Sequence, residues 1–103
     1  MWRTIPLQFA ADHPTAAGHF PSNPIIPGAL LIDAVLEALG EYARVDGEIT
    51  VLAAKFFRPV RPGESLRIRW QFHAGSRATF ECQLDGNDEL VARGTLAFGQ
   101  APP

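Results

Sequence analysis

Residues 18–40 read GHFPSNPIIPGALLIDAVLEALG, and this stretch decides the fold. A proline-rich loop leads into a run of Ala, Leu, Ile and Val residues, which predicts a single helix from Gly28 to about Val45. The charged residues of this helix lie four positions apart and therefore share one edge: Asp33, Glu37 and Glu41. Carboxylates beside so much apolar surface are costly unless they are paired, protonated or used in chemistry, so this acidic edge indicates function.

The rest of the chain predicts β-strands that cover the helix. Apolar residues separated by turn signals predict five strands, over residues 2–9, 49–57, 65–73, 77–84 and 89–98. Pro6 confines the first strand to an edge of the sheet. The apolar run from Ile49 to Phe57 is typical of a strand buried on both faces. The expected fold class is α+β, with one long buried helix wrapped by a curved antiparallel sheet made of an N-terminal strand and a four-stranded meander.

Length and composition indicate one small globular domain. The 103 residues are 47% hydrophobic and carry a net charge of -2, which argues against disorder and offers no basic field for nucleic acid. We expect a single domain over residues 1–98 and a flexible tail over residues 99–103. A domain of this size leaves much apolar surface uncovered, and an oligomer would cover more of it.

The sequence contains no sign of export or of a membrane anchor. No apolar run approaches membrane-spanning length, and the first residues do not resemble a signal peptide, so we expect a cytoplasmic protein with no membrane partner. The one cysteine, Cys82, excludes a disulfide framework within the chain and is expected in the core. No His, Asp or Glu cluster has metal-ligand spacing, so no metal is predicted.

Two motifs are similar to those of a known family. Residues 19–28, HFPSNPIIPG, with Asp33 after them, resemble the HFPG-x-P-hydrophobic-x-PG signature of 3-hydroxyacyl-[acyl-carrier-protein] dehydratases of the hot-dog fold. Residues 56–66, FFRPVRPGESL, resemble that family's second block, PV-x-PG before a strand. The chain departs from the family pattern at Ser22, where glycine is usual, at Glu37, where glutamine is common, and in its shorter N-terminus. Short members of this kind resemble accessory dehydratases of pathways for aryl polyene pigments or other specialised acyl chains.

The resemblance implies a fold, an assembly and a reaction. The fold is the hot-dog fold, and the assembly is a homodimer or higher homo-oligomer with its active site in a tunnel at the subunit interface. The resemblance makes His19 and Asp33 the catalytic pair, contributed by different subunits. The implied partner is an acyl carrier protein with a phosphopantetheine-linked acyl chain. The implied reaction removes water from a 3-hydroxyacyl thioester to leave the trans-2-enoyl thioester, and it needs no cofactor.

The chemistry of these residue types fits this reaction. His19 can act as a general base for the α-proton. Desolvation and the neighbouring Glu37 would favour the protonated form of Asp33, which then acts as the acid for the departing hydroxyl, with Glu37 sharing its proton. Open N–H groups at the helix start can polarise the thioester carbonyl. The residues expected to contact substrate are Gly28, Ala29, Phe20, Pro27 and Glu37.

Two other functions fit the same residues. A hot-dog thioesterase would use the Asp33 carboxylate to drive attack by water and would have no use for a base at His19. A catalytically silent subunit would bind acyl chains or pair with an active dehydratase, and Ser22 and Glu37 are the features that favour it. A basic group is expected to be either a solvated face of the sheet or a docking site for an acidic carrier. Its members are Lys55, Arg58, Arg61, Arg67 and Arg69.

Overall fold

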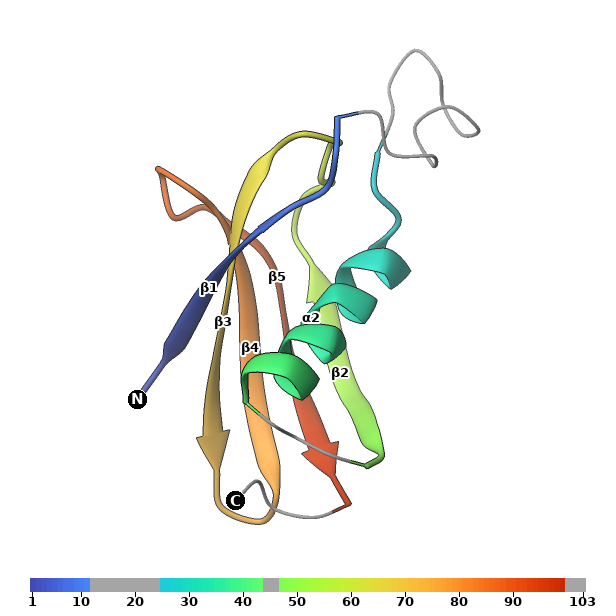
Figure 1. Cartoon of the computed structure of the whole chain (residues 1–103), viewed down its shortest axis with the longest axis vertical. Helices are drawn as coiled ribbons and strands as arrows, with labels where there is room; N and C mark the ends of the chain where they lie inside the picture. Colours follow the sequence, from blue (N-terminus) through green and yellow to red (C-terminus); the bar gives the residue numbers. More distant parts are fainter. Residues whose placement is uncertain (12–24, 44–46, 100–103) are drawn as a thin grey trace.

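The computed structural model describes residues 1–11, 25–43 and 47–99. Within these residues, one helix lies across one face of a five-stranded antiparallel sheet (Figure 1). This arrangement confirms the α+β class expected from the sequence. The helix is α2, Gly28–Tyr42, and the strands are β1 Arg3–Gln8, β2 Ile49–Phe56, β3 Ser65–His73, β4 Arg77–Leu84 and β5 Leu90–Phe98.

The strand order corrects the expected four-stranded meander. The sheet runs β1-β3-β4-β5-β2, so β3, β4 and β5 are successive hairpins, but β2 lies beyond β5 and not beside β3. The segment 57–64 between β2 and β3 is too long to impose a tight hairpin, and it crosses from one side of the sheet to the other. β1 takes the place beside β3 and forms the opposite edge, as Pro6 predicts.

The expectation that β2 is buried on both faces is wrong. Every residue from Leu52 to Phe56 is exposed, and the side chains of these two residues are 44% and 46% exposed. A register shift between Val51 and Ala53 marks a bulge against β5, which ends the regular alternation of faces. In the described part of the chain no strand pairs with the outer edge of β2. An apolar run in the sequence does not show whether residues of its own chain or a second copy of the chain cover it. Here the described residues of its own chain leave it exposed.

The core lies between α2 and the sheet. The helix buries Leu31, Val35, Ala38 and Leu39 against the strands. The alternation expected for β3 and β4 is confirmed, because Leu66, Ile68 and Trp70 are buried on β3 and Ala78, Phe80 and Cys82 are buried on β4. Burying one such large apolar side chain contributes roughly 1.5–3 kcal/mol.

The helix is shorter than predicted at its C-terminal end. It ends at Tyr42, and the N–H of Ala43 still donates to the carbonyl of Leu39 at 3.2 Å. The predicted end at Val45 lies outside the described residues. Gly47 follows with φ +85°, a left-handed conformation that suits glycine and starts the turn into β2. Over the described ranges, the structure contains no helix that is both long and apolar enough to span a bilayer.

Candidate active site

A short bridge joins the two sequence motifs at the start of α2. The N–H of Ile26 donates to the carbonyl of Val60 at 2.7 Å, and the two residues form an isolated antiparallel pair. Both side chains are buried. Because Ile26 belongs to the first motif and Val60 to the second, this bridge holds the two PG-containing segments side by side and fixes where α2 begins.

The first turn of α2 presents open hydrogen-bond donors. The carbonyl of Pro27 accepts from the N–H groups of Leu30 and Leu31, at 3.0 and 3.4 Å, and no side chain caps the helix. Among the described residues, the N–H groups of Gly28 and Ala29 have no acceptor. These donors lie at the positive end of the helix dipole, where a carbonyl oxygen that gains negative charge is stabilised.

An apolar cavity of about 540 Å³ is lined by Gly28, the first residue of α2. Arg58 is the charged residue of its lining, and its guanidinium is held by the carboxylate of Glu64 at 3.1 Å and lies 3.5 Å from that of Glu89. An apolar space with a few polar groups at one end suits a chain-like ligand with a polar head. The lining residues are Ile25, Ile26, Pro27, Gly28, Leu31, Phe56, Phe57, Arg58, Pro59 and Val60.

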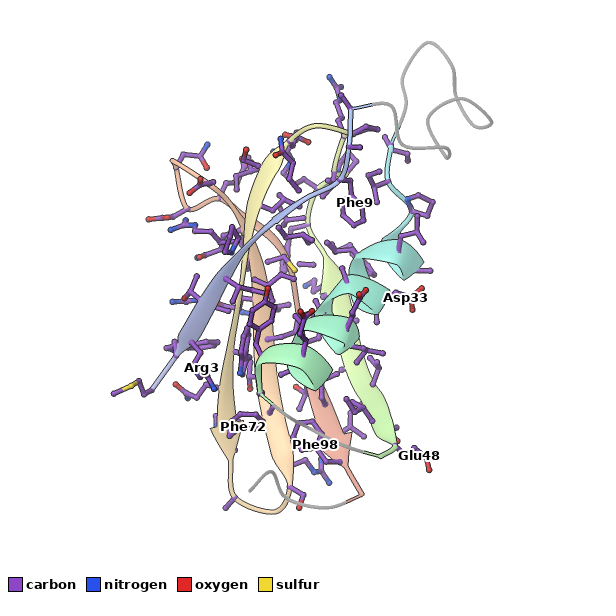
Figure 2. All side chains as sticks on the ribbon, viewed as in Figure 1. Arg3, Phe9, Asp33, Glu48, Phe72 and Phe98 are labelled. Atoms are coloured by element: carbon purple, nitrogen blue, oxygen red, sulfur yellow. The ribbon has the colours of Figure 1, made fainter. Side chains whose placement is uncertain are left out.

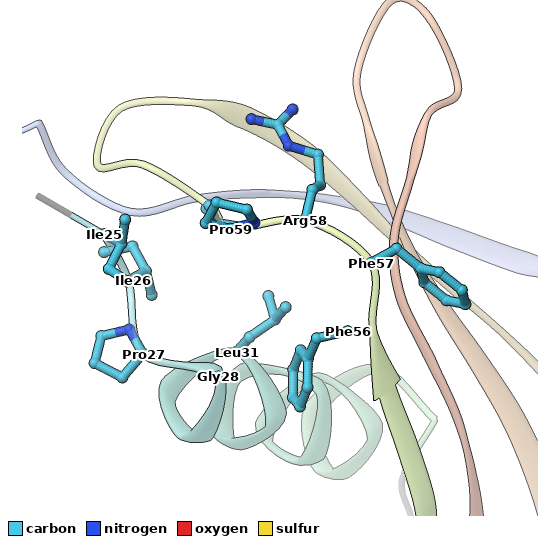
Figure 3. A pocket seen from close by; sticks show the side chains of 10 residues that line it. Ile25, Ile26, Pro27, Gly28, Leu31, Phe56, Phe57, Arg58 and Pro59 are labelled. Carbon is cyan, nitrogen blue, oxygen red and sulfur yellow. The ribbon is translucent and has the colours of Figure 1, made fainter. Parts of the chain in front are cut away.

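Two aromatic residues at the end of β2 lie differently around this cavity. Figure 3 shows Leu31 and Phe56 pointing into the space between α2 and the segment after β2, whereas the ring of Phe57 points away. The Phe56 ring lies directly against Gly28: a Cβ built there would be 2.9 Å from its Cζ atom. Glycine is therefore required at position 28 for the ring to occupy this place. Phe56 belongs to the second sequence motif, but nothing in the sequence pattern predicted a role for it in the site.

The predicted acid lies outside the cavity. Asp33 is exposed on α2 (Figure 2), on the side of the helix away from the buried Leu31 and Val35. The burial expected for Asp33 is therefore not provided by the described residues, because the sheet covers only the other side of the helix. Any apolar cover for this carboxylate has to come from outside the described chain.

The remaining predicted site residues do not all lie at the cavity. Pro27 and Gly28 line the cavity, whereas Ala29 is exposed outside it. Glu37 lines a separate groove of about 200 Å³ between α2 and β1. The predicted base His19 and the predicted contact Phe20 lie outside the described residues. The structure thus brings together the helix start and the second motif, but neither Asp33 nor Glu37 lines the cavity between them.

Carboxylates pair with three members of the predicted basic group, Arg58, Arg67 and Arg69. Besides Arg58, Arg69 donates from Nε to Glu81 at 2.7 Å. Arg67 pairs with Asp85 and Asp88, and the hydrogen bond that it donates to Asp88 raises the pKa of Arg67 above its already high value.

Two cations, Lys55 and Arg93, lie close to the Phe57 ring. Lys55 Nζ lies 5.3 Å and Arg93 Cζ 5.6 Å from the ring centroid, and within the described ranges neither cation has a carboxylate partner. Arg93 was not part of the predicted group. Over the same ranges, no three His, Cys, Asp or Glu side chains gather as metal ligands would.

Comparison with known proteins places this site in a family context. Residues 3–95 match the ApeI-like family model, described as ApeI dehydratase. The 3-hydroxyacyl-[acyl-carrier-protein] dehydratase FabZ of Thermomicrobium roseum is 34% identical over 110 residues, covering 89% of this chain and 68% of that protein. FabZ of Chloroflexus aggregans is 33% identical over 107 residues, covering 91% of this chain and 72% of that protein.

A solved structure shares the fold. A chain of the dehydratase heterocomplex ApeI:P from Xenorhabdus doucetiae superposes on this one with a TM-score of 0.77. The superposition covers 96% of this chain and 88% of that chain, at 23% sequence identity. The hot-dog fold implied by the two sequence motifs is therefore confirmed.

Proposed function

The chain belongs to the ApeI-like family of dehydratases, and we propose that it removes water from a 3-hydroxyacyl thioester carried on an acyl carrier protein. The observation that carries this proposal is the apolar cavity of about 540 Å³ lined by Gly28, whose N–H group has no acceptor among the described residues. An acyl chain fits the cavity, and its thioester carbonyl fits the donors. The FabZ relatives are named for this same substrate class.

In the proposed reaction, two side chains move protons and the helix start stabilises charge. His19 takes the α-proton, and the electron pair of that C–H bond forms the double bond between the α- and β-carbons. The bond from the β-carbon to its hydroxyl oxygen breaks, and Asp33 donates a proton so that water leaves. The N–H groups of Gly28 and Ala29 stabilise the negative charge that builds on the thioester oxygen. The resulting histidinium and carboxylate then exchange a proton to restore the starting state.

For this role of Asp33 we propose that a second copy of the chain takes part. A carboxyl group that donates a proton near neutral pH needs apolar cover, and Asp33 is exposed in the single chain. The open outer edge of β2 and the exposed side chains of Leu52 and Phe56 support a homodimer formed through this strand. In that dimer, the partner would cover the outer side of α2 and bring its own loop histidine toward Asp33.

The proposed carrier docks next to the cavity. Lys55 and Arg93 lie on Phe57, a residue at the cavity rim, and they offer positive charge that the described carboxylates do not neutralise. A phosphopantetheine arm and an acidic carrier surface both complement this charge. We also propose a cytoplasmic location, since Cys82 is free and buried and a reducing compartment would keep it so.

The direct test is a two-channel assay on the purified protein. Ultraviolet absorbance reports enoyl thioester formation from a 3-hydroxyacyl carrier substrate, and a thiol reagent reports hydrolysis of the thioester. The proposal expects enoyl thioester without released thiol. Released thiol without enoyl product would favour the thioesterase. Neither signal, across several chain lengths, would overturn the proposal and favour a silent subunit, a possibility raised by the heterocomplex of the similar structure.

A further inference from the structure

Phe56 and Phe57 are adjacent, alike in type and similarly exposed, at 46% and 43%, yet they face different surroundings. The Phe56 ring lies in the apolar cavity against Gly28 (Figure 3). The Phe57 ring lies among the cations Lys55 and Arg93. Loss of one ring therefore changes the cavity, whereas loss of the other changes the charged surface beside it.

We propose that Phe56 is the specificity-determining residue of the cavity, and that its ring limits which acyl chains fit beside the helix start. This inference rests on the proposed function, because it concerns the acyl part of the same substrate. The ring atoms Cζ, Cε1 and Cε2 lie 2.9, 3.0 and 3.3 Å from the position that a Cβ atom would take at residue 28. A chain whose carbonyl reaches the N–H of Gly28 therefore passes along the edge of this ring.

The ring meets the helix start with its tip, which suits a role in selection. Phe56 is the last residue of β2, at the point where the strand passes into the segment that borders the cavity. Its atoms nearest Gly28 are the far end of the side chain. A smaller residue at position 56 opens space at the helix start, so longer or bulkier chains gain more than short ones.

Binding of non-reacting analogues tests this inference without relying on turnover. The probes are amide analogues of acyl-pantetheine with four-carbon and twelve-carbon chains, titrated by calorimetry into the unmodified protein, Phe56→Leu and Phe57→Leu. In Phe56→Leu, the preference for the twelve-carbon over the four-carbon amide should rise by about tenfold, in line with the effect of one lost group in an apolar pocket. In the matched control Phe57→Leu, that ratio should stay within about twofold.

Several outcomes would overturn the inference. It is wrong if both variants shift the ratio equally, if Phe56→Leu leaves it unchanged, or if neither amide binds. Light scattering checks that each variant keeps the oligomeric state of the unmodified protein. If Phe56→Leu does not, Phe56→Met replaces it with the same expected rise in the ratio, because Met is also apolar and lacks the ring. Absence of enoyl formation by the unmodified protein would refute the proposed reaction, while the amide ratio would still decide the role of Phe56.

Discussion

The ring of Phe56 occupies the place of a side chain at Gly28, with its Cζ atom 2.9 Å from the position of an added Cβ. Gly94 on β5 has a similar relationship with Phe80, but there an added Cβ would also collide with the backbone oxygen of Ala53. The two contacts differ in how far the neighbour can move. Phe56 is nearly half exposed, whereas Phe80 is fully buried and the Ala53 oxygen belongs to the sheet.

The two glycines should therefore respond differently to alanine. Gly94→Ala should lower the free energy of unfolding by about 3 kcal/mol or prevent folding, because neither the buried ring nor the strand can yield. Gly28→Ala should cost less than about 1 kcal/mol, since the exposed Phe56 ring can turn aside. Urea denaturation monitored by tryptophan fluorescence measures the free energy of unfolding of both variants. Equal losses of stability at the two positions would contradict this account of the contacts.

The two edges of the sheet should differ in oligomerisation. Leu52→Asp places a charge on the exposed apolar edge strand β2, and we expect it to convert the proposed dimer to a monomer in light scattering. The control Thr4→Asp places the same charge on the other edge strand, β1, where Pro6 already lacks an N–H to donate. It should leave the dimer intact. A monomeric unmodified protein, or dissociation by both variants, would rule out assembly through β2.

Burial of Cys82 should make stability depend on alkaline pH. The thiol is fully buried in β4, and burial raises its pKa from 9.0 to about 12. The folded state therefore keeps a proton that the unfolded state loses. The contribution of the protonated thiol to the free energy of unfolding is complete below pH 9. It falls between pH 9 and pH 12, by about 1.4 kcal/mol per pH unit.

Comparison with Cys82→Ala isolates this effect. The variant lacks the thiol, so its free energy of unfolding should fall less steeply than that of the unmodified protein in urea titrations from pH 8 to pH 11. Subtracting the two curves removes the titration of other groups. Parallel curves would mean that the thiol is not held protonated by the core.

The sequence predicted the elements well because local pattern determines them. The alternation of Leu66, Ile68 and Trp70 gives both the strand and its buried face, and Gly28 with the apolar run after it gives the helix. The position of β2 was not predictable from the same pattern. An apolar strand has the same sequence pattern whether its own chain or a second copy covers it. The long segment 57–64 also leaves open which strand lies beside β2 in the sheet.

The site was predicted in part for the same reason. The resemblance to the family motif led us to expect Pro27, Gly28 and Asp33 at the site, but a motif along a chain does not show which side of α2 faces the sheet. The exposure of Asp33 follows from the packing of Leu31 and Val35, which a helical pattern apolar nearly all round did not specify. The contact between Phe56 and Gly28 joins two distant motifs and requires the fold to be known.

The most direct test of the central claim compares two carboxylates on the exposed side of one helix. Enoyl thioester formation from a 3-hydroxyacyl carrier substrate is measured for the unmodified protein, Asp33→Asn, His19→Ala and the control Glu41→Gln. The account predicts that Asp33→Asn and His19→Ala each lose about 10²–10⁴-fold in kcat, while Glu41→Gln stays within about twofold and all variants remain folded. Full activity of Asp33→Asn, or an equal loss in Glu41→Gln, would contradict the role assigned to Asp33.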